Sequence, residues 1–201
     1  MPRADPGTLA SGRSERFAQR EAIIDIGQAQ DELRAAGQSG APGVFVSGLA
    51  WLAADAAWYV AGPLYAFAAL FIGGMLIFPA SFAIARAFRA PRPTKGNPLN
   101  ALGFEVAIPL FAGLLIAFAL LPFSETFGFA ALAVVVGARY FAFATLYRER
   151  LYWLLGALLF AIGTGFAIKD GALPFHITLA VGAAELVFAA WLFTRWNSAQ
   201  G

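Results

Sequence analysis

Residues 64–85 read LYAFAALFIGGMLIFPASFAIA, an apolar stretch without a single charged side chain. A helix needs about 20 mostly apolar residues to cross the hydrocarbon core of a bilayer. Inside lipid, backbone amides are satisfied only in a helix or a closed barrel, and the alternating pattern of a barrel strand is absent here. We therefore predict a membrane-spanning helix over 64–85.

Five further stretches of the same character lie on either side of it. Turn residues or charged residues separate them, at 62–63, 86–100, 122, 148–150 and 169–171. We predict spans at 43–61, 64–85, 101–121, 126–147, 151–168 and 173–194. The expected fold is all-α, a polytopic transmembrane bundle of about six spans that occupies 41–201. The composition agrees, because 60% of the residues are hydrophobic and 13% are charged, against about 45–50% and about 25% in soluble domains.

Residues 1–40 are expected to form a separate polar tail that contains a short amphipathic helix. Between Ser14 and Gly37, small or apolar residues recur at helical spacing: Ala22, Ile26, Ala29, Leu33 and Ala36. Such a stripe favours a helix that Ser14 caps and Gly37 ends. The stripe is narrow and rich in alanine. Two arrangements stay open: a helix lying on the membrane or bundle surface, and a solvated, partly frayed helix.

The basic residues predict the orientation. Twelve of the fourteen Lys and Arg residues lie in the tail, in 86–100, in 148–150 or at Arg195. If the chain crosses the membrane six times, all of these segments lie on the same side of it. Only Lys169 lies on the opposite side, and Arg139 lies within a span. Cytoplasmic loops carry the excess of Lys and Arg. We expect both termini on the cytoplasmic side of a bacterial plasma membrane, with the lipid bilayer as the main partner.

Three segments resemble a known family. They are GAPGV (40–44) leading into SGLAWL (47–52), GGMLI (73–77) followed by Pro79, and GNPLN (96–100) followed by Glu105. In this order they resemble an uncharacterised family of small bacterial multi-span membrane proteins, over residues 35–150. The resemblance implies the fold and the membrane location and carries no activity. The family pattern has a His before the span-2 proline, where this chain has Phe78, so any role of that His is not transferred.

Ionisable residues inside spans are candidates for function, because they are costly there. Four are present: Asp55, Glu105, Arg139 and Glu185. Arg139 and Glu185 lie at similar depth, roughly 12–14 Å from the same side at about 1.5 Å per residue. We predict that Arg139 contacts Glu185, or alternatively Glu105, inside the bundle. Such a pair is either structural or part of an ion relay or a binding site for a charged solute.

The other polar positions have plainer interpretations. Asn100 is expected to cap span 3, with Glu105 near that helix start, and Asp55 is expected to reach water at the outer end of span 1. His176 is interpreted as an interface residue. Small residues favour close helix packing on three faces, namely Thr178-Gly182-Glu185-Ala189, Ala69-xxx-Gly73 and Ala161-xxx-Gly165.

Two functions remain open at this point. The chain has no Cys, one His and no catalytic or phosphate-binding motif, so we expect no enzyme, no metal site, no cofactor and no nucleic-acid partner. The first function is a non-catalytic membrane protein with a structural or partner-dependent role, with a homo-oligomer as one form. The alternative is a transporter or channel for a small solute or ion, which uses Asp55, Glu105, Arg139 and Glu185.

The predicted orientation is tested by thiol labelling, because a chain without cysteine gives a clean background. Gly62→Cys and Asp170→Cys should react with a membrane-impermeant maleimide added to intact cells. Thr94→Cys and Ser198→Cys should react only after permeabilisation, because the excess of basic residues keeps their segments inside. Labelling of Thr94→Cys in intact cells would reverse the assignment.

Overall fold

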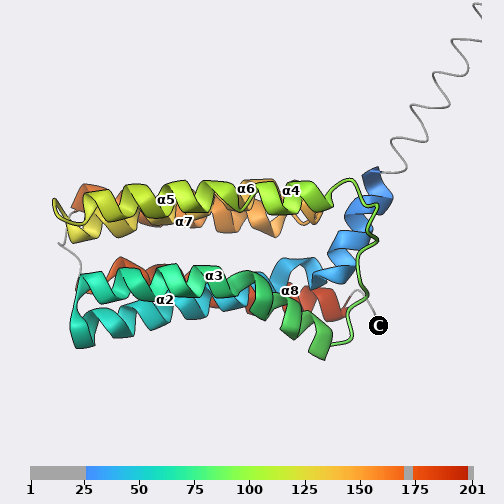
Figure 1. Ribbon diagram of the computed structural model, residues 1–201, viewed down its shortest axis with the longest axis horizontal. Coiled ribbons are helices and arrows are strands. Elements are labelled where there is room, and N and C mark those ends of the chain that lie inside the picture. Colours follow the sequence, from blue (N-terminus) through green and yellow to red (C-terminus); the bar gives the residue numbers. More distant parts are fainter. Residues whose placement is uncertain (1–25, 170–173, 199–201) are drawn as a thin grey trace, which may run out of the picture.

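The computed structural model describes residues 26–169 and 174–198, and every regular element in those ranges is a helix (Figure 1). A helical segment covers 26–36 and a 3-10 helix, η1, covers Gln38–Gly40. The remaining helices are α2 (Ala41–Ala61), α3 (Pro63–Ala87), α4 (Asn100–Glu105), α5 (Ile108–Leu120), α6 (Glu125–Leu146), α7 (Leu151–Lys169) and α8 (Ile177–Ser198). The predicted all-α fold is confirmed. The part of the predicted tail helix before residue 26 lies outside the described residues.

Six stretches of the described chain are long and apolar enough to cross a membrane, and the protein is therefore a multi-pass membrane protein. Their ends agree with the predicted spans to within five residues, and only the last span is shifted by several residues at both ends. That span was expected to begin at 173 and end at 194, whereas α8 begins at Ile177 and continues to Ser198. A bend at Pro174 and Phe175 precedes it, consistent with proline as a residue that seldom continues a helix.

The third span is broken, which the sequence analysis did not predict. It consists of α4 and α5, with Val106 and Ala107 between them, instead of one helix over 101–121. Pro109 stands in the first turn of α5 and has no amide hydrogen to donate to the carbonyl of Glu105. The helix tightens locally to hydrogen bonds of the 3-10 type: the Ala107 amide donates to Phe104 O, three residues earlier, at 2.9 Å. Proline thus separates the two half-helices.

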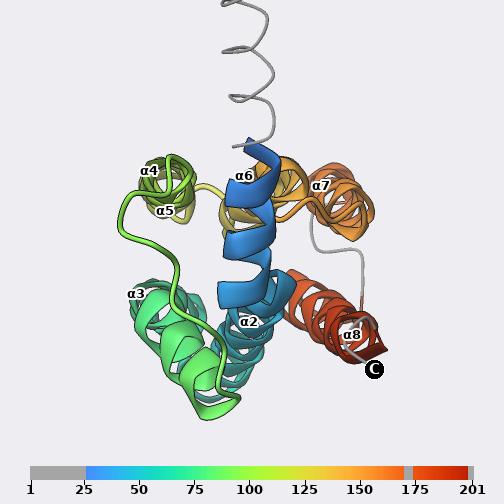
Figure 2. The ribbon, with the colours of Figure 1, turned by 90° about the vertical axis from the view of Figure 1, so that its right-hand side faces the viewer.

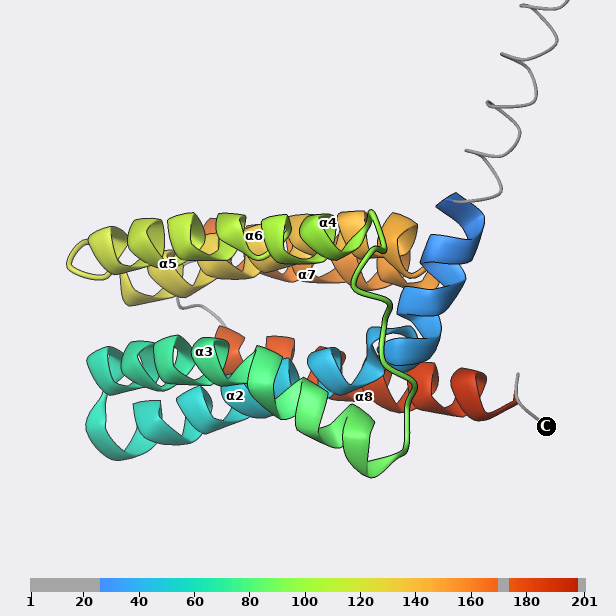
Figure 3. The ribbon, with the colours of Figure 1, turned by 45° about the vertical axis from the view of Figure 1, so that its right-hand side comes forward.

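The helices form two layers of three. One layer contains α3, α2 and α8, and the other contains α5, α6 and α7, with α2 and α6 in the middle (Figure 2). Large side chains fill the space between the layers, among them Trp51 of α2 and Tyr140 of α6, which are both almost completely buried. The segment 26–36, the connection from α3 to α4 and the end of α8 lie at one end of the bundle, here termed the tail end (Figure 3).

Glycines allow α6 and α7 to pack closely. A Cβ atom on Gly137 would lie 2.8 Å from the carbonyl oxygen of Gly156, and one on Gly163 would lie 2.7 Å from that of Ala130. Such distances are too short for carbon and oxygen, so a larger residue would force the helices apart. Backbone contact of this kind is the usual way in which small residues hold membrane helices together.

The three small-residue faces behave differently. On α8, Thr178, Glu185 and Ala189 are fully buried and Gly182 packs on α2, where its Cβ would lie 2.8 Å from Leu52. On α3, a Cβ on Gly73 would lie 2.5 Å from that of Ala50 on α2. These two faces pack helices within the chain, as predicted. Gly165 of α7, in contrast, has no atom within 4 Å of its Cβ position, so its face makes no close contact.

Gly163 and Gly165 on α7 form a matched pair for mutation. Gly163→Ala should destabilise the protein by about 1–3 kcal/mol, because the new methyl group would overlap the backbone of α6. Gly165→Ala should leave stability unchanged or raise it by up to about 1 kcal/mol, because alanine favours a helix over glycine. The loss of helical circular dichroism on heating in detergent measures both. Equal effects of the two substitutions would show that the α6–α7 contact is not limited by Gly163.

Candidate functional site

A hydrogen bond joins the two layers in the interior of the bundle. The hydroxyl of Tyr140 on α6 donates to Oε1 of Glu185 on α8 at 2.6 Å. Both residues are almost completely buried, and Ser47 of α2, which is also buried, lies near both. The second carboxylate oxygen, Oε2, is buried and has no hydrogen-bond partner among the described residues.

Arg139 precedes Tyr140 on α6, and its guanidinium group forms no ion pair with any residue that the structure describes. Its Cζ atom lies 5.3 Å from the ring centre of Phe143 and 5.6 Å from that of Tyr140. Nε is buried without an acceptor, and no carboxylate of the described residues lies within 4.0 Å of the group. The two ring contacts are cation–π interactions, which stabilise a cation without neutralising it.

The predicted ion pair of Arg139 is therefore not formed. Glu185, the first expected partner, accepts a hydrogen bond from Tyr140 instead. Glu105, the alternative partner, is the last residue of α4 and is exposed. Similar depth in the membrane was a correct reason to place Arg139 near Glu185, but depth does not specify the direction of a side chain around its helix.

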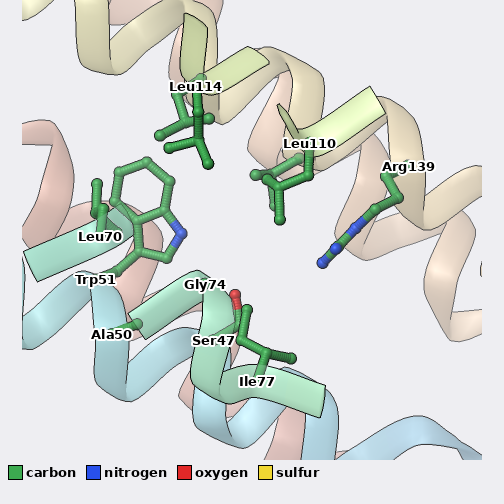
Figure 4. A pocket seen from close by; sticks show the side chains of 11 residues that line it. Ser47, Ala50, Trp51, Leu70, Gly74, Ile77, Leu110, Leu114 and Arg139 are labelled. Carbon is green, nitrogen blue, oxygen red and sulfur yellow. The ribbon is translucent and has the colours of Figure 1, made fainter. Parts of the chain in front are cut away.

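A cavity lies beside Arg139, between α2 and α3 of one layer and α5 and α6 of the other (Figure 4). Its volume is about 20 Å³, which is enough for about one water molecule. Arg139 and Ser47 supply its only ionisable and hydroxyl groups, and apolar side chains such as Trp51, Leu70 and Leu114 form the walls. Glu185 does not line this cavity. The guanidinium group points into the space opposite Ser47 (Figure 4).

Asp55 belongs to a different cluster, at the opposite end of the bundle from the tail end. It is 8% exposed, accepts a hydrogen bond from Thr178 Oγ1 at 2.8 Å and lies 3.2 Å from Nδ1 of His176. The His176 ring stacks on Trp58 and packs against Tyr59, with ring centres 4.3 Å and 4.6 Å apart. The expectation that Asp55 reaches water is wrong, because the start of α8 covers it.

Glu149 is a buried carboxylate that the sequence analysis missed. It lies in the connection from α6 to α7 and is 4% exposed. Arg34 of the helical segment approaches Oε2 at 3.6 Å, and Arg195 at the end of α8 approaches Oε1 at 3.9 Å. Arg148, Glu149 and Arg150 were interpreted only as a charged loop. The sequence offers no signal that the middle residue turns inward.

The GNPLN segment holds the helical segment 26–36 against the bundle. The side-chain amide of Asn97 donates to Ala29 O and to Glu32 Oε2, each at 2.9 Å, and Glu32 Oε1 accepts from the backbone amide of Thr94. As predicted, span 3 begins after Pro98, at Asn100. The predicted cap is displaced by one residue: Leu99 is the N-cap, and the Asn100 side chain donates to Thr94 O at 2.9 Å.

Stacked tyrosines connect the tail end with the interior site. The Tyr152 ring stacks on Tyr140 at 5.7 Å, and its hydroxyl donates to Ser39 O at 2.7 Å. Gly40 follows with φ of 78°, and a Cβ there would lie 2.2 Å from the Tyr152 hydroxyl. Glycine suits this position for two reasons, the left-handed backbone and the close approach of the ring.

Comparison with known proteins places the chain in a family. Residues 26–195 match the family described as Family of unknown function (DUF7010), and because the match covers most of the chain, the protein belongs to that family. The matched region includes the helical segment 26–36 as well as the spans. No curated protein and no solved structure matches the chain. The family has no assigned function, so the activity has to be inferred from the site.

The contact of Glu32 with the α3–α4 connection should depend on pH. Hydrogen bonds from Thr94, first from its side chain and then from its backbone, and from Asn97 lower the pKa of Glu32. Because the pKa of Glu32 is lowered, the stability that its ionised carboxylate contributes is fully present above the usual pKa of glutamate. It is lost as the pH falls through the lower pKa of the folded state. A spin label at the exposed position Gln28, introduced as Gln28→Cys, should become mobile on acidification.

Two variants provide the controls. Glu32→Gln should abolish this acid transition, because the amide does not ionise. Asp31→Asn should keep it, since Asp31 makes only an exposed pair with Arg148 at 3.7 Å. An unchanged transition in Glu32→Gln would assign the pH dependence to another group.

Proposed function

We propose that this member of the DUF7010 family binds a small solute between its two helix layers and acts as a carrier or channel for it. The observation that carries this proposal is that two groups in the interior, Arg139 Nε at the cavity and Glu185 Oε2 outside its lining, are buried without hydrogen-bond partners among the described residues. A purely structural pair would place these groups in contact. An unpaired buried charge costs about 3–5 kcal/mol, and a ligand or water that completes the site would offset this cost.

The broken third span supports the same proposal. Val106 and Ala107 keep right-handed helical backbone angles, so the interruption is a tighter turn within one span. Leu110, in the first turn of α5 after the break, lines the cavity next to Arg139. Solute binding accounts for these features without a chemical reaction, so we propose no catalytic activity.

The proposed orientation places the tail end in the cytoplasm of a bacterial cell. The segment 26–36, the α3–α4 connection, Glu149 and Arg195 meet at that end. The excess of Lys and Arg on these segments favours the cytoplasmic side. In this orientation the cavity lies near mid-membrane, because Val136 and Trp51, which line it, are near the middle of α6 and α2. Arg139 lies at its cytoplasmic side, about 10 Å before the end of α6 at 1.5 Å per residue.

One observation favours the second candidate, a structural or partner-dependent role. Arg139 rests on two aromatic rings and Glu185 accepts one hydrogen bond, so neither group is without stabilisation. In that case the cavity would stay dry and would bind no solute. Hydration of the cavity therefore separates the two candidates.

Leu114→Cys in the cavity wall should react with a small water-soluble methanethiosulfonate in intact membranes. The matched control is Leu159→Cys on α7, which is fully buried and does not line the cavity. A panel of anionic, cationic and neutral solutes should then contain a class that stabilises the wild type, by about 2.7 kcal/mol at a hundredfold excess over the dissociation constant. Arg139→Gln should lose this effect. If Leu114→Cys is as unreactive as Leu159→Cys, the solute-binding proposal fails.

A further inference from the structure

We propose that the end of α3 and the connection from α3 to α4 bind the headgroup of an anionic phospholipid, in the leaflet at the tail end. Four exposed basic residues form this surface, here termed the α3 basic surface: Arg86, Arg89, Arg92 and Lys95. It begins at the end of an edge helix, apart from the interior site (Figure 2). The proposal is therefore independent of whether the cavity binds a solute.

The described part of the protein does not neutralise the α3 basic surface. None of its four side chains forms an ion pair with a described residue. The sequence has no acidic residue over 56–104, and Glu32, which contacts the connection, is occupied by hydrogen bonds. Arg34 and Arg195 at the same end differ, because they share the carboxylate of Glu149. An anion in the adjoining leaflet therefore meets positive charge without an acidic partner.

The α3 basic surface begins at the depth of lipid headgroups. Tyr59 and Tyr65 are exposed where α2 turns into α3, and exposed tyrosines of this kind mark a membrane–water interface. The part of α3 from Tyr65 to Arg86 is roughly 30 Å long at about 1.5 Å per residue, which matches the thickness of the hydrocarbon core. Arg86 therefore lies at the second interface, where the phosphates of the tail-end leaflet are found.

The Arg86 side chain lies back along α3 towards the bilayer. Its Cζ atom is 4.6 Å from the ring centre of Phe82, which lies one turn earlier and hence deeper in the membrane. Phe82 is 49% exposed, and α3 is the least buried of the six spans, so lipid surrounds both side chains. Arginine binds a phosphate group through two parallel hydrogen bonds. Arg86 thus presents its guanidinium group at the phosphate of a neighbouring lipid.

The other basic residues follow where α3 ends. The chain leaves the helix at Arg89, which has φ of 58° and whose amide donates to Arg86 O at 3.0 Å. The exposed Phe88 meets Phe193 of α8 with ring centres 6.3 Å apart, and this contact holds the end of α3 against α8. Basic clusters next to a membrane helix attract anionic lipids, and aromatic rings beside them suit the interface.

A fluorophore beside Arg86 tests the proposal. Bimane is attached to Ala87→Cys, an exposed position in a chain without cysteine, and the full-length protein is placed in nanodiscs of phosphatidylcholine. Phosphatidylglycerol with a spin label near the top of one acyl chain is compared with phosphatidylcholine labelled in the same way. Phosphatidylglycerol should quench bimane at a mole fraction at least about fivefold lower, the factor that corresponds to about 1 kcal/mol for one basic residue. Raised salt should reduce this preference.

Matched variants locate the effect. Arg86→Gln should reduce the preference several-fold, and Arg86→Gln combined with Arg89→Gln should abolish it. Phe82→Leu should reduce it in part, because Arg86 loses the ring on which it lies. Arg150→Gln, which removes the same charge at an exposed arginine of the other layer, should keep it, and helical circular dichroism checks the folding of every variant. Equal quenching by the two lipids in the wild type would overturn the proposal. A loss in Arg150→Gln as large as in Arg86→Gln would also overturn it, because net charge alone would then explain the preference.

Discussion

The hydrogen bond from Tyr140 to Glu185 is the interaction on which the interior of this bundle depends. It joins the two helix layers where lipid surrounds them and no bulk water can replace a missing partner. By holding the carboxylate on the α8 side, it leaves the neighbouring Arg139 to face the other way, into the cavity. The cavity is thus lined by the cation and not by the carboxylate, although the two charges are near enough to interact.

The cavity also depends on the interruption of the third span between α4 and α5. Pro109 divides the third span into α4 and α5, and the second half-helix contributes Leu110 and Leu114 to the wall. The opposite wall comes from α2 and α3, which are locked together where Gly73 meets Ala50. Close packing within each layer therefore coexists with looser packing between the edge helices α3 and α5.

The tail end adds a second level of organisation. Glu149 forms ion pairs with Arg34 and Arg195. The Asn97 side chain donates to the backbone of the helical segment, and the Tyr152 hydroxyl donates to Ser39 O. These contacts join four segments that are far apart in the chain. Since Tyr152 also stacks on Tyr140, the docked segment and the interior site share one aromatic cluster. Movement of the helical segment 26–36 would therefore be transmitted to the interior through the contact between Tyr152 and Tyr140.

The sequence alone was sufficient to locate the membrane spans. A bilayer requires long apolar helices, and an unbroken apolar stretch such as 64–85 has no alternative structure there. It also identified Arg139 and Glu185 as unusual, since a charge inside a span is costly wherever it points. Only the tertiary structure decided which groups meet. Arg139 faces a cavity instead of Glu185, Asp55 is covered by Thr178 and His176, and Glu149 turns inward from a charged loop. The reason is that hydropathy is a property of each residue alone, whereas pairing depends on the rotation of every helix about its own axis, which the packing of all the helices sets together.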